Sequence, residues 1–343
     1  MQIKDWLMRL SPAPGVSGLT GALDAAQEIL SAYAQTRREG GSLTGFMKGR
    51  TDRTVLLDAH IDEIGMIVTS VEEGGFVRVA KVGGIDIRTL AAQPVTIWGR
   101  RPVEGIFAST PPHLRKEADE GAPDIAERVI DTGLSGEEAR ALISPGDRVT
   151  FLQEPATLLD GGFTGKSLDD RAGVAALLTA AHILSEKGEP PCNVVFLLSD
   201  QEELGCRGAK TAAFALRPDE AVAVDVSFGD SPGVPAHKTG RLGAGGMIGI
   251  SPVLSAAVTR RLQTLARAEG IPCQPEVMGG ETSTNADVIA LTGAGVPCGL
   301  VSIPLRSMHT AAEVIRLSDV EAVGRLLAAY VAAGGLKGGE GVC

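Results

Sequence analysis

Five short stretches of the chain place acidic or imidazole side chains where runs of apolar residues end. The polar residues at these positions are His60, Asp62, Asp169, Asp170, Glu202, Glu203, Asp225 and His309. Carboxylates that converge without cations repel one another and are costly to bury. Two divalent ions would remove that cost, and imidazoles with carboxylates suit zinc, cobalt or manganese better than calcium or magnesium alone. The pattern predicts a centre of two metal ions, in which one carboxylate bridges the ions and another stays free as a base.

Each stretch has a simpler explanation when it is taken alone. The Asp169–Asp170 pair could cap a helix, because the helix dipole favours acids at its start. The Glu202–Glu203 pair could be solvated on a loop, and a histidine spaced like His60 from Asp62 is common by chance. Only the combination of all five stretches favours a metal centre.

The positions of the remaining histidines and the absence of other motifs limit the predicted ligands and the predicted chemistry. His182 lies within an Ala/Leu-rich helical pattern, and His113 and His237 lie in Pro- or Gly-rich segments, so none of the three is expected to bind metal. The sequence contains no G-x-S-x-G, Walker or H-E-x-x-H motif. Serine-hydrolase, nucleotide-binding and single-zinc protease chemistry are therefore not predicted.

The elements that must position these side chains alternate regularly after Gly165. We expect apolar strands at residues 193–200, 221–226, 274–277 and 296–303, and helices at residues 172–187, 208–216, 251–269, 286–291 and 318–333. Such alternation is typical of an α/β fold with a mostly parallel sheet between helices. Functional side chains gather at the carboxyl ends of strands in these sheets. We therefore expect the candidates at one edge of the sheet.

Residues 71–162 have a different sequence pattern, which predicts a small β-rich domain. Short apolar alternations such as GFVRVAKV and PVTIWG are separated by glycine, proline and charge, with one helix expected at residues 136–142. This domain would be inserted into an α/β domain made of residues 1–70 and 163–343. Within residues 1–70 of the α/β domain, we expect a helix over residues 20–37 and strands at 45–48, 54–59 and 64–70. The C-terminal GGLKGGEGVC is predicted to be disordered.

Composition restricts the class of protein. The 343 residues are 44% apolar, enough to fill a core, and the net charge of -10 without a basic block disfavours nucleic acid or an anionic membrane as a partner. Five scattered cysteines without a CxxC pair argue against a disulfide framework and predict a reducing cytoplasm. No apolar run reaches the roughly 18 residues of a membrane span, and no export signal is expected.

Five motifs in order closely resemble those of a known family. HIDEIG, GKSLDDRAG, DQEELGCRGA, VAVDVS and PLRSMHTAAEV are similar to motifs of the TET and glutamyl aminopeptidase family of two-metal aminopeptidases, metallopeptidase family forty-two. Some members of that family were once described as endoglucanases. The resemblance covers nearly the whole chain, including VGGIDIRTL and TPPHLRK of the insertion, which resemble the family's oligomerisation domain. It implies a zinc-peptidase-like fold, two divalent ions per subunit, short peptide substrates and a homo-oligomer that builds from dimers to a dodecamer.

The resemblance also implies a role for each candidate residue. The implied metal ligands are His60 and Asp225 for one ion, Glu203 and His309 for the other, and Asp169 as the bridge. Asp170 is the alternative bridge, and Asp169 is preferred because relatives with LDNR keep only the first acid. Asp62 would fix the tautomer of His60, and Glu202 would be the general base.

Three other functions are alternatives to the aminopeptidase. A metal-dependent amidohydrolase acting on N-acyl amino acids could use the same ions. A glycoside hydrolase needs two carboxylic acids and no metal, and 3% aromatic residues offer little surface for sugar stacking. A non-catalytic module is disfavoured because the implied ligand set is complete.

The sequence departs from the family's motifs at two places. Relatives often carry Thr-Asp where this chain has Thr284-Asn285, and Ser-Pro where it has Thr310-Ala311. The first lies where a pocket for the N-terminal side chain is expected. The first departure therefore affects the expected substrate preference, and the expected chemistry is unchanged.

Overall fold

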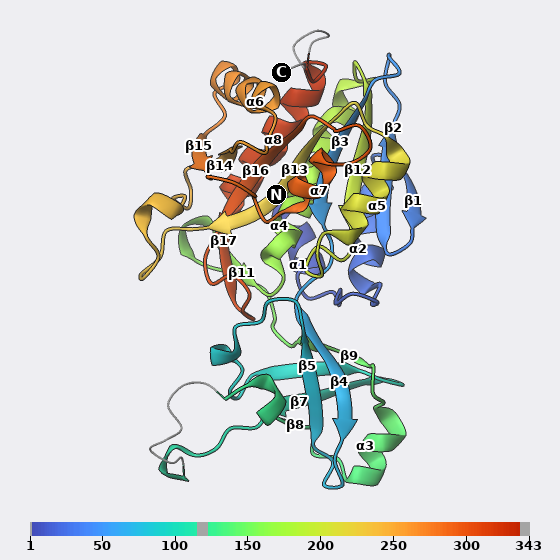
Figure 1. Cartoon of the computed structure of the whole chain (residues 1–343), viewed down its shortest axis with the longest axis vertical. Helices are drawn as coiled ribbons and strands as arrows, with labels where there is room; N and C mark the ends of the chain where they lie inside the picture. Colours follow the sequence, from blue (N-terminus) through green and yellow to red (C-terminus); the bar gives the residue numbers. More distant parts are fainter. Residues whose placement is uncertain (1, 115–122, 337–343) are drawn as a thin grey trace.

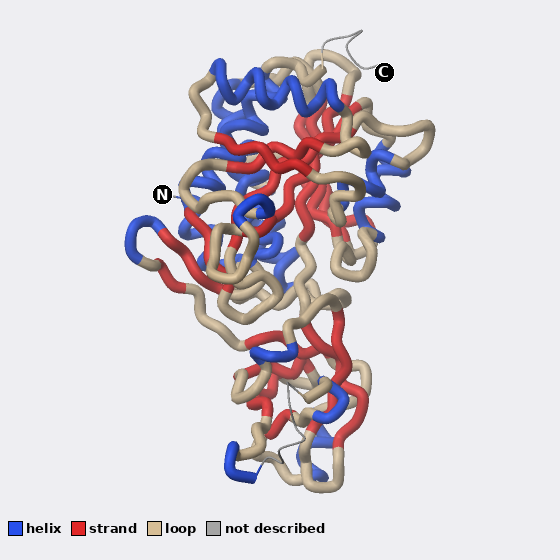
Figure 2. The backbone as a smooth tube through the Cα atoms, turned by 60° about the vertical axis from the view of Figure 1, so that its left-hand side comes forward, coloured by secondary structure: helices blue, strands red, loops and turns tan. Residues whose placement is uncertain are grey.

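The chain folds into an α/β unit and a smaller β-barrel, which lie one above the other in Figure 1. The computed structural model describes residues 2–114 and 123–336. Figure 2 shows the strands of the α/β unit between its helices, with the barrel below them. The α/β class and the mostly parallel sheet predicted from the sequence are confirmed.

An eight-stranded sheet forms the centre of the α/β unit. Its middle strands, β12 (Asn193–Ser199), β3 (Thr54–His60), β13 (Glu220–Phe228) and β16 (Cys298–Leu305), run parallel. One edge is extended by β2 (Ser42–Met47) and β1 (Gln35–Glu39), and the other by β14 (Gly246–Ile250) and β15 (Cys273–Val277). Every residue of β12 and β16 is buried, as expected for apolar strands covered on both faces.

Helices cover both faces of this sheet. One face packs against α1 (Gln2–Leu10), α2 (Gly21–Leu30), α4 (Leu168–Lys187), α6 (Ala256–Ala268) and α8 (Leu317–Ala332). The other face packs against α5 (Arg207–Leu216) and α7 (Asn285–Ala290). Helix α4 is buried along most of its length and lies against α8, where Gly324 allows a close approach to Thr179. The long Ala/Leu-rich helix is therefore the centre of the larger hydrophobic core.

The barrel closes on itself and has a hydrophobic core of its own. Its strands are β4 (Gly65–Val71), β5 (Val77–Val82), β8 (Ile130–Asp131), β7 (Pro102–Phe107), β6 (Pro94–Trp98) and β9 (Arg148–Phe151), in that order around the barrel. Helix α3 (Gly136–Leu142) begins with a capping box formed by Ser135 and Glu138, and it covers the range expected from the sequence. A three-stranded sheet of β10 (Ala156–Thr157), β11 (Gly162–Gly165) and β17 (Glu313–Arg316) joins the barrel segment back to the α/β unit.

The structure differs from the sequence expectations at several boundaries. The helix predicted over residues 20–37 is wrong in length, because α2 ends at Leu30 and residues 35–39 form edge strand β1 of a hairpin that turns at Gly40. Strand β4, expected at residues 64–70, pairs with β5 and β9 in the barrel. Helix α6 begins after Ser255, whose hydroxyl caps it, rather than at residue 251. Residues 337–343 of the tail expected to be disordered lie outside the described residues.

Candidate metal centre

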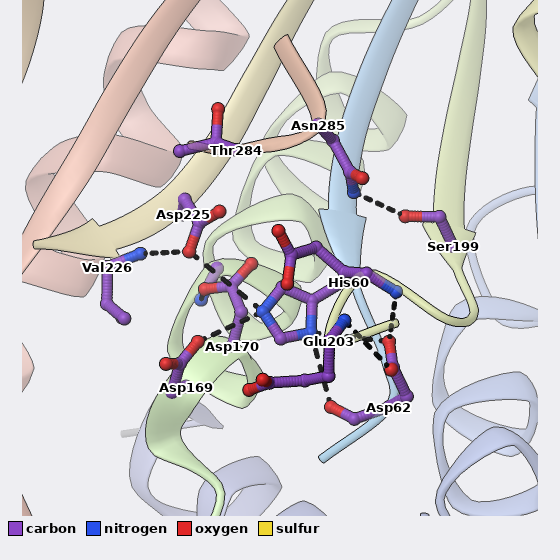
Figure 3. A network of polar contacts seen from close by, with 12 residues as sticks. His60, Asp62, Asp169, Asp170, Ser199, Glu203, Asp225, Val226, Thr284 and Asn285 are labelled. Carbon is purple, nitrogen blue, oxygen red and sulfur yellow. Dashed lines mark hydrogen bonds and ion pairs between the residues drawn. The ribbon is translucent and has the colours of Figure 1, made fainter. Parts of the chain in front are cut away.

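The candidate residues come together at the carboxyl ends of the central parallel strands. His60 is the last residue of β3, Asp225 lies near the end of β13, and Glu203 follows β12. His309 lies after β16, and Asp169 lies at the start of α4. Figure 3 shows the side chains of His60, Asp169, Glu203 and Asp225 pointing toward a common point. Their convergence follows from parallel strands that end at one edge of the sheet.

Asp169 lies between the two imidazoles. Its Oδ1 is 3.0 Å from Nε2 of His60, and its Oδ2 is 3.4 Å from Nε2 of His309. Asp225 completes the first side, with Oδ1 3.9 Å from Nε2 of His60, and Glu203 completes the second, with Oε1 3.6 Å from Nε2 of His309. These residues form two groups of possible metal ligands, and the ligand atoms of each group lie within 4.8 Å of one another. Asp169 belongs to both groups.

Asp170 points away from this shared position. Its Oδ1 accepts a hydrogen bond of 2.9 Å from the backbone N–H of Gly173, and its Oδ2 is buried without a hydrogen-bond partner. The backbone at both aspartates departs from helical angles, so the two side chains diverge. Among the described residues, Asp169 belongs to two of the three groups suited to a metal ion, and Asp170 belongs to none. The geometry therefore favours Asp169 over the alternative bridge.

Asp62 lies behind the centre and connects two of its loops. Its carboxylate accepts the backbone N–H groups of Glu202 at 3.0 Å and Glu203 at 3.3 Å. Nδ1 of His60 lies 3.2 Å from the carbonyl oxygen of Asp62 and 3.5 Å from its Oδ1. Asp62 thus orients the imidazole on one side and holds the two glutamates on the other.

Glu313, which was not predicted as a site residue from the sequence, holds two other candidate ligands in place. One of its oxygens accepts the backbone N–H of Asp169 and the other accepts that of His309, each at 3.0 Å. Glu313 is 1% exposed and belongs to β17, which pairs with β11 just before α4. Its place four residues after His309 in MHTAAEV was the only signal in the sequence.

Burial makes this group of carboxylates unfavourable without a cation. Burial and the charge of Asp169 raise the pKa of Glu203 to about 8. Burial also raises the pKa of Asp225 well above its usual range, helped by the charges of Asp170 and Asp169. For Asp169, burial alone would raise the pKa, but hydrogen bonds from His309 and His60 hold it below its usual range. Cations that replace the retained protons would stabilise the ionised acids, so the donor set fits divalent metal ions.

Strained backbone adjoins the candidate ligands. Ser167, Gln201 and His309 are non-glycine residues with φ near +60°. Ser167 precedes the Asp169 loop, and Gln201 precedes the two glutamates. Residues in this conformation cost about 1–3 kcal/mol and cluster at functional sites. Their positions support a functional role for these loops.

The barrel also contributes to the centre. In the segment after β5, a Cβ added to Gly84 would lie 2.7 Å from Nδ1 of His309, and one added to Gly83 would lie 2.9 Å from Oε2 of Glu203. Gly83 also has a φ of +79°, which favours glycine. The backbone N–H of Asp86 donates to the carbonyl of His309 at 3.3 Å. The barrel therefore packs directly against one side of the candidate centre.

A cavity of about 720 Å³ opens beside the centre and is lined by Asp169, Glu202, Asp225, Glu276, Thr284 and His309 among others. Of the Thr284-Asn285 pair expected at the pocket, Thr284 lines the cavity and Asn285 does not. The buried Asn285 amide instead donates to Asp58 at 2.8 Å and to Ser199 at 2.9 Å. Figure 3 shows Asn285 directed at Ser199.

The other histidines lie apart from the ligand groups. His182 lies on α4 beside Tyr33, and His113 is exposed in the barrel segment. His237 is exposed at the edge of the cavity. In the described part of the chain, none of the three belongs to a group of possible metal ligands.

Comparison with known proteins identifies the family. The profile of the M42 glutamyl aminopeptidase family matches residues 41–326. The chain belongs to this family. It is 31% identical to a lysyl aminopeptidase of Pyrococcus furiosus over 331 residues, which cover 92% of this chain and 94% of the relative. A glutamyl aminopeptidase of Lactococcus lactis is 26% identical, with 93% of each chain covered.

Solved structures agree with this membership in the M42 family. An aminopeptidase of Desulfurococcus kamchatkensis superposes with a TM-score of 0.90 at 32% identity, covering 97% of this chain and 95% of the other. The TET1 peptidase of Pyrococcus horikoshii, which can assemble into a tetrahedron or a large octahedral shell, superposes with a TM-score of 0.85 at 30% identity and covers 96% and 99%. These relatives support aminopeptidase activity for the M42 chain. Within its described residues, no helix is long and apolar enough to cross a membrane.

Proposed function

We propose that this M42 chain is a two-metal aminopeptidase that removes N-terminal residues from short peptides. The observation that carries the proposal is the position of Asp169, whose two oxygens face His60 and His309 on opposite sides. A carboxylate in this position can bridge two ions. The two ligand groups that share it provide one imidazole and one further carboxylate on each side.

His60 and Asp225 would hold one ion, and His309 and Glu203 the other. Zinc suits imidazole and carboxylate ligands, and cobalt or manganese can take the same donors. Asp62 and Glu313 would orient the ligands through the hydrogen bonds described above. The ions would supply a Lewis acid and would lower the pKa of a water molecule toward neutrality.

Glu202 would be the general base. It lines the cavity with Asp169 and Glu203, and its backbone is held by Asp62. Glu202 belongs to neither of the two groups that share Asp169, and it forms a third group with His60 and Glu203. With Glu203 assigned to the ion of His309, the carboxylate of Glu202 would serve in proton transfer. Burial and the charges of Asp169 and Asp62 raise the pKa of Glu202, which suits a base that works near neutral pH. Glu202 would accept a proton from the attacking water and deliver it to the nitrogen of the leaving peptide.

Paired substrates with free and blocked N-termini test the proposal. Metal-free protein is reconstituted with zinc, cobalt or manganese and assayed on Ala-, Leu-, Lys-, Arg- and Glu-based fluorogenic substrates and on their N-acetyl derivatives. We expect hydrolysis only of free amines, loss of activity with a chelator and recovery with metal. Activity restricted to the N-acetyl series would refute the aminopeptidase and restore the amidohydrolase alternative, which the family membership does not favour.

Two further properties belong to this proposal. We infer a homo-oligomer, because TET peptidases of similar fold are a dodecamer or form shells. Light scattering of the purified protein measures the copy number, and a monomer at micromolar concentration would contradict the inference. A cytoplasmic location stays a prediction from the scattered cysteines, and those at positions 192, 206, 273 and 298 are unpaired in the structure.

A further inference from the structure

Two carboxylates that line the cavity, those of Glu276 and Glu281, have no role in the proposed metal centre. Glu276 belongs to β15 and lines the cavity together with Asp225 and Ser227. Ser227 donates its hydroxyl to Oε1 of Glu276, and Ser302 donates its hydroxyl to Oε2 at 2.6 Å. A carboxylate has about four acceptor positions, so two hydroxyl donors leave acceptor capacity for a ligand.

The sheet register places this carboxylate beside the proposed centre. Ser302 on β16 is the direct partner of Asp225 on β13 in a parallel pair, so both side chains lie on the same face of the sheet. Ser227, two residues after Asp225, also lies on that face. One strand spacing, about 5 Å, and one hydrogen bond therefore separate Glu276 from the residue proposed to hold a metal ion.

The charge of Glu276 is not balanced by a cation of the protein. Among the residues that the structure describes, no lysine, arginine or histidine nitrogen lies within 4.0 Å of its carboxylate. Lys238 lines the same cavity but is exposed at its edge, as is Glu281. These two opposite charges face water, where they are screened, while Glu276 is half-buried between two serines.

We propose that Glu276 selects substrates whose N-terminal side chain is positively charged, namely lysine or arginine. This inference rests on the proposed aminopeptidase function and names the substrate class of the same site. An ammonium or guanidinium group can donate to the free acceptor positions of Glu276 while its alkyl stem packs on Met247, Met278 and Met308, which also line the cavity. The long side chain extends from the metal ligands toward β15, and the α-amino group stays at the centre.

A purely structural role for Glu276 predicts a different result. The two serine bonds tie edge strand β15 to β13 and β16, so loss of the carboxylate could weaken the cavity wall without any effect on charge selection. That role would lower the activity on all substrates in parallel. A role in selection changes the ratio between a charged substrate and a neutral substrate of the same shape.

The experiment compares arginyl and citrullinyl fluorogenic substrates, which have nearly the same shape and differ in charge. The zinc- or cobalt-loaded enzyme is assayed as the wild type, as Glu276→Gln and as Glu281→Gln. We expect kcat/KM of the wild type to favour arginine by about 10–100-fold, the range of a hydrogen bond to a charged group. Glu276→Gln should bring this ratio to about one, whereas Glu281→Gln should change it by less than about threefold, since exposed charges interact weakly.

The wild-type ratio tests the proposal even if Glu276→Gln fails to fold. A wild-type ratio near one, or a preference for a glutamyl substrate through Lys238, would overturn charge selection by Glu276. A high ratio that persists in Glu276→Gln would assign the selection to another residue. If arginyl and citrullinyl substrates are cleaved equally well, only this inference fails. If no substrate with a free amine is cleaved, the proposed function fails.

Discussion

Glu313→Gln tests whether this buried carboxylate positions the proposed metal ligands. Glutamine keeps one acceptor oxygen, so it can retain the bond to the backbone N–H of Asp169 or to that of His309, but not both. Its NH2 group would face the remaining N–H, which leaves a buried donor without an acceptor. We expect the loop of the unpaired residue to move away from the centre.

The magnitude follows from the lost hydrogen bond. A hydrogen bond to a charged group contributes about 1.5–3 kcal/mol. Residues that orient metal ligands change metal affinity by about 10–100-fold when they are mutated, which corresponds to roughly 1.4–2.7 kcal/mol. The two estimates agree. Burial and the charge of Asp169 raise the pKa of Glu313 well above its usual range, so the substitution also removes an unfavourable buried acid. In metal-free protein this relief offsets part of the loss, and the effect should appear mainly in metal binding.

The assay is a competition titration of zinc into metal-free protein with a chromophoric chelator. Glu313→Gln should bind at least one zinc ion about 10–100-fold more weakly than the wild type. Glu269→Gln, which changes an exposed glutamate at the end of α6, is the matched control and should stay within about twofold. Circular dichroism verifies that each variant is folded. Wild-type zinc affinity at both positions in folded Glu313→Gln would refute the positioning role.

Three further predictions use the same structure. Glu202→Gln should retain two zinc ions by elemental analysis and lose about 10²–10⁴-fold in kcat, whereas His309→Ala should lose zinc; full turnover in Glu202→Gln would reject it as the base. The metal-free pKa values, about 8 for Glu203 and about 9 for His309, exceed the usual 4.5 and 6.5, so the folded state holds protons that the unfolded state releases. The melting temperature in chelator should therefore fall as pH rises from 6.5 to 9, and the increase caused by zinc should grow; the opposite slope would contradict these shifts. Gly324→Ala would place a Cβ 2.5 Å from Cβ of Thr179. This substitution should lower the free energy of unfolding, measured by urea titration, by about 1–3 kcal/mol. An unchanged free energy of unfolding would show that α4 and α8 move apart without strain.

Much of the fold could be predicted from the sequence, because the patterns that indicate these helices and strands are local. Strands β12 and β16 are nearly continuous apolar runs. Such runs are typical of parallel strands that are buried on both faces of a sheet. Helix α3 was predicted with its observed bounds, and the capping box that begins it is also a local feature. The helix predicted over residues 20–37 failed at β1, because an exposed edge strand has no apolar pattern and exists only through pairing with β2.

The types of the site residues were also readable, since polar side chains at the ends of apolar strands of a parallel sheet meet at one edge. His60, Asp225 and Glu203 were identified in this way, and the family motifs agreed with that choice. Their exact roles are still proposals, but their convergence is a property of the fold.

Only the tertiary structure decided which side chains face each other. It directed Asp169 between two imidazoles and turned Asp170 toward Gly173, although the two acids are adjacent in the sequence. It also buried Asn285 against Asp58 and brought Glu313 under two loops. These contacts join residues as far as 227 positions apart. Their geometry depends on packing between distant elements, which local composition and spacing do not encode.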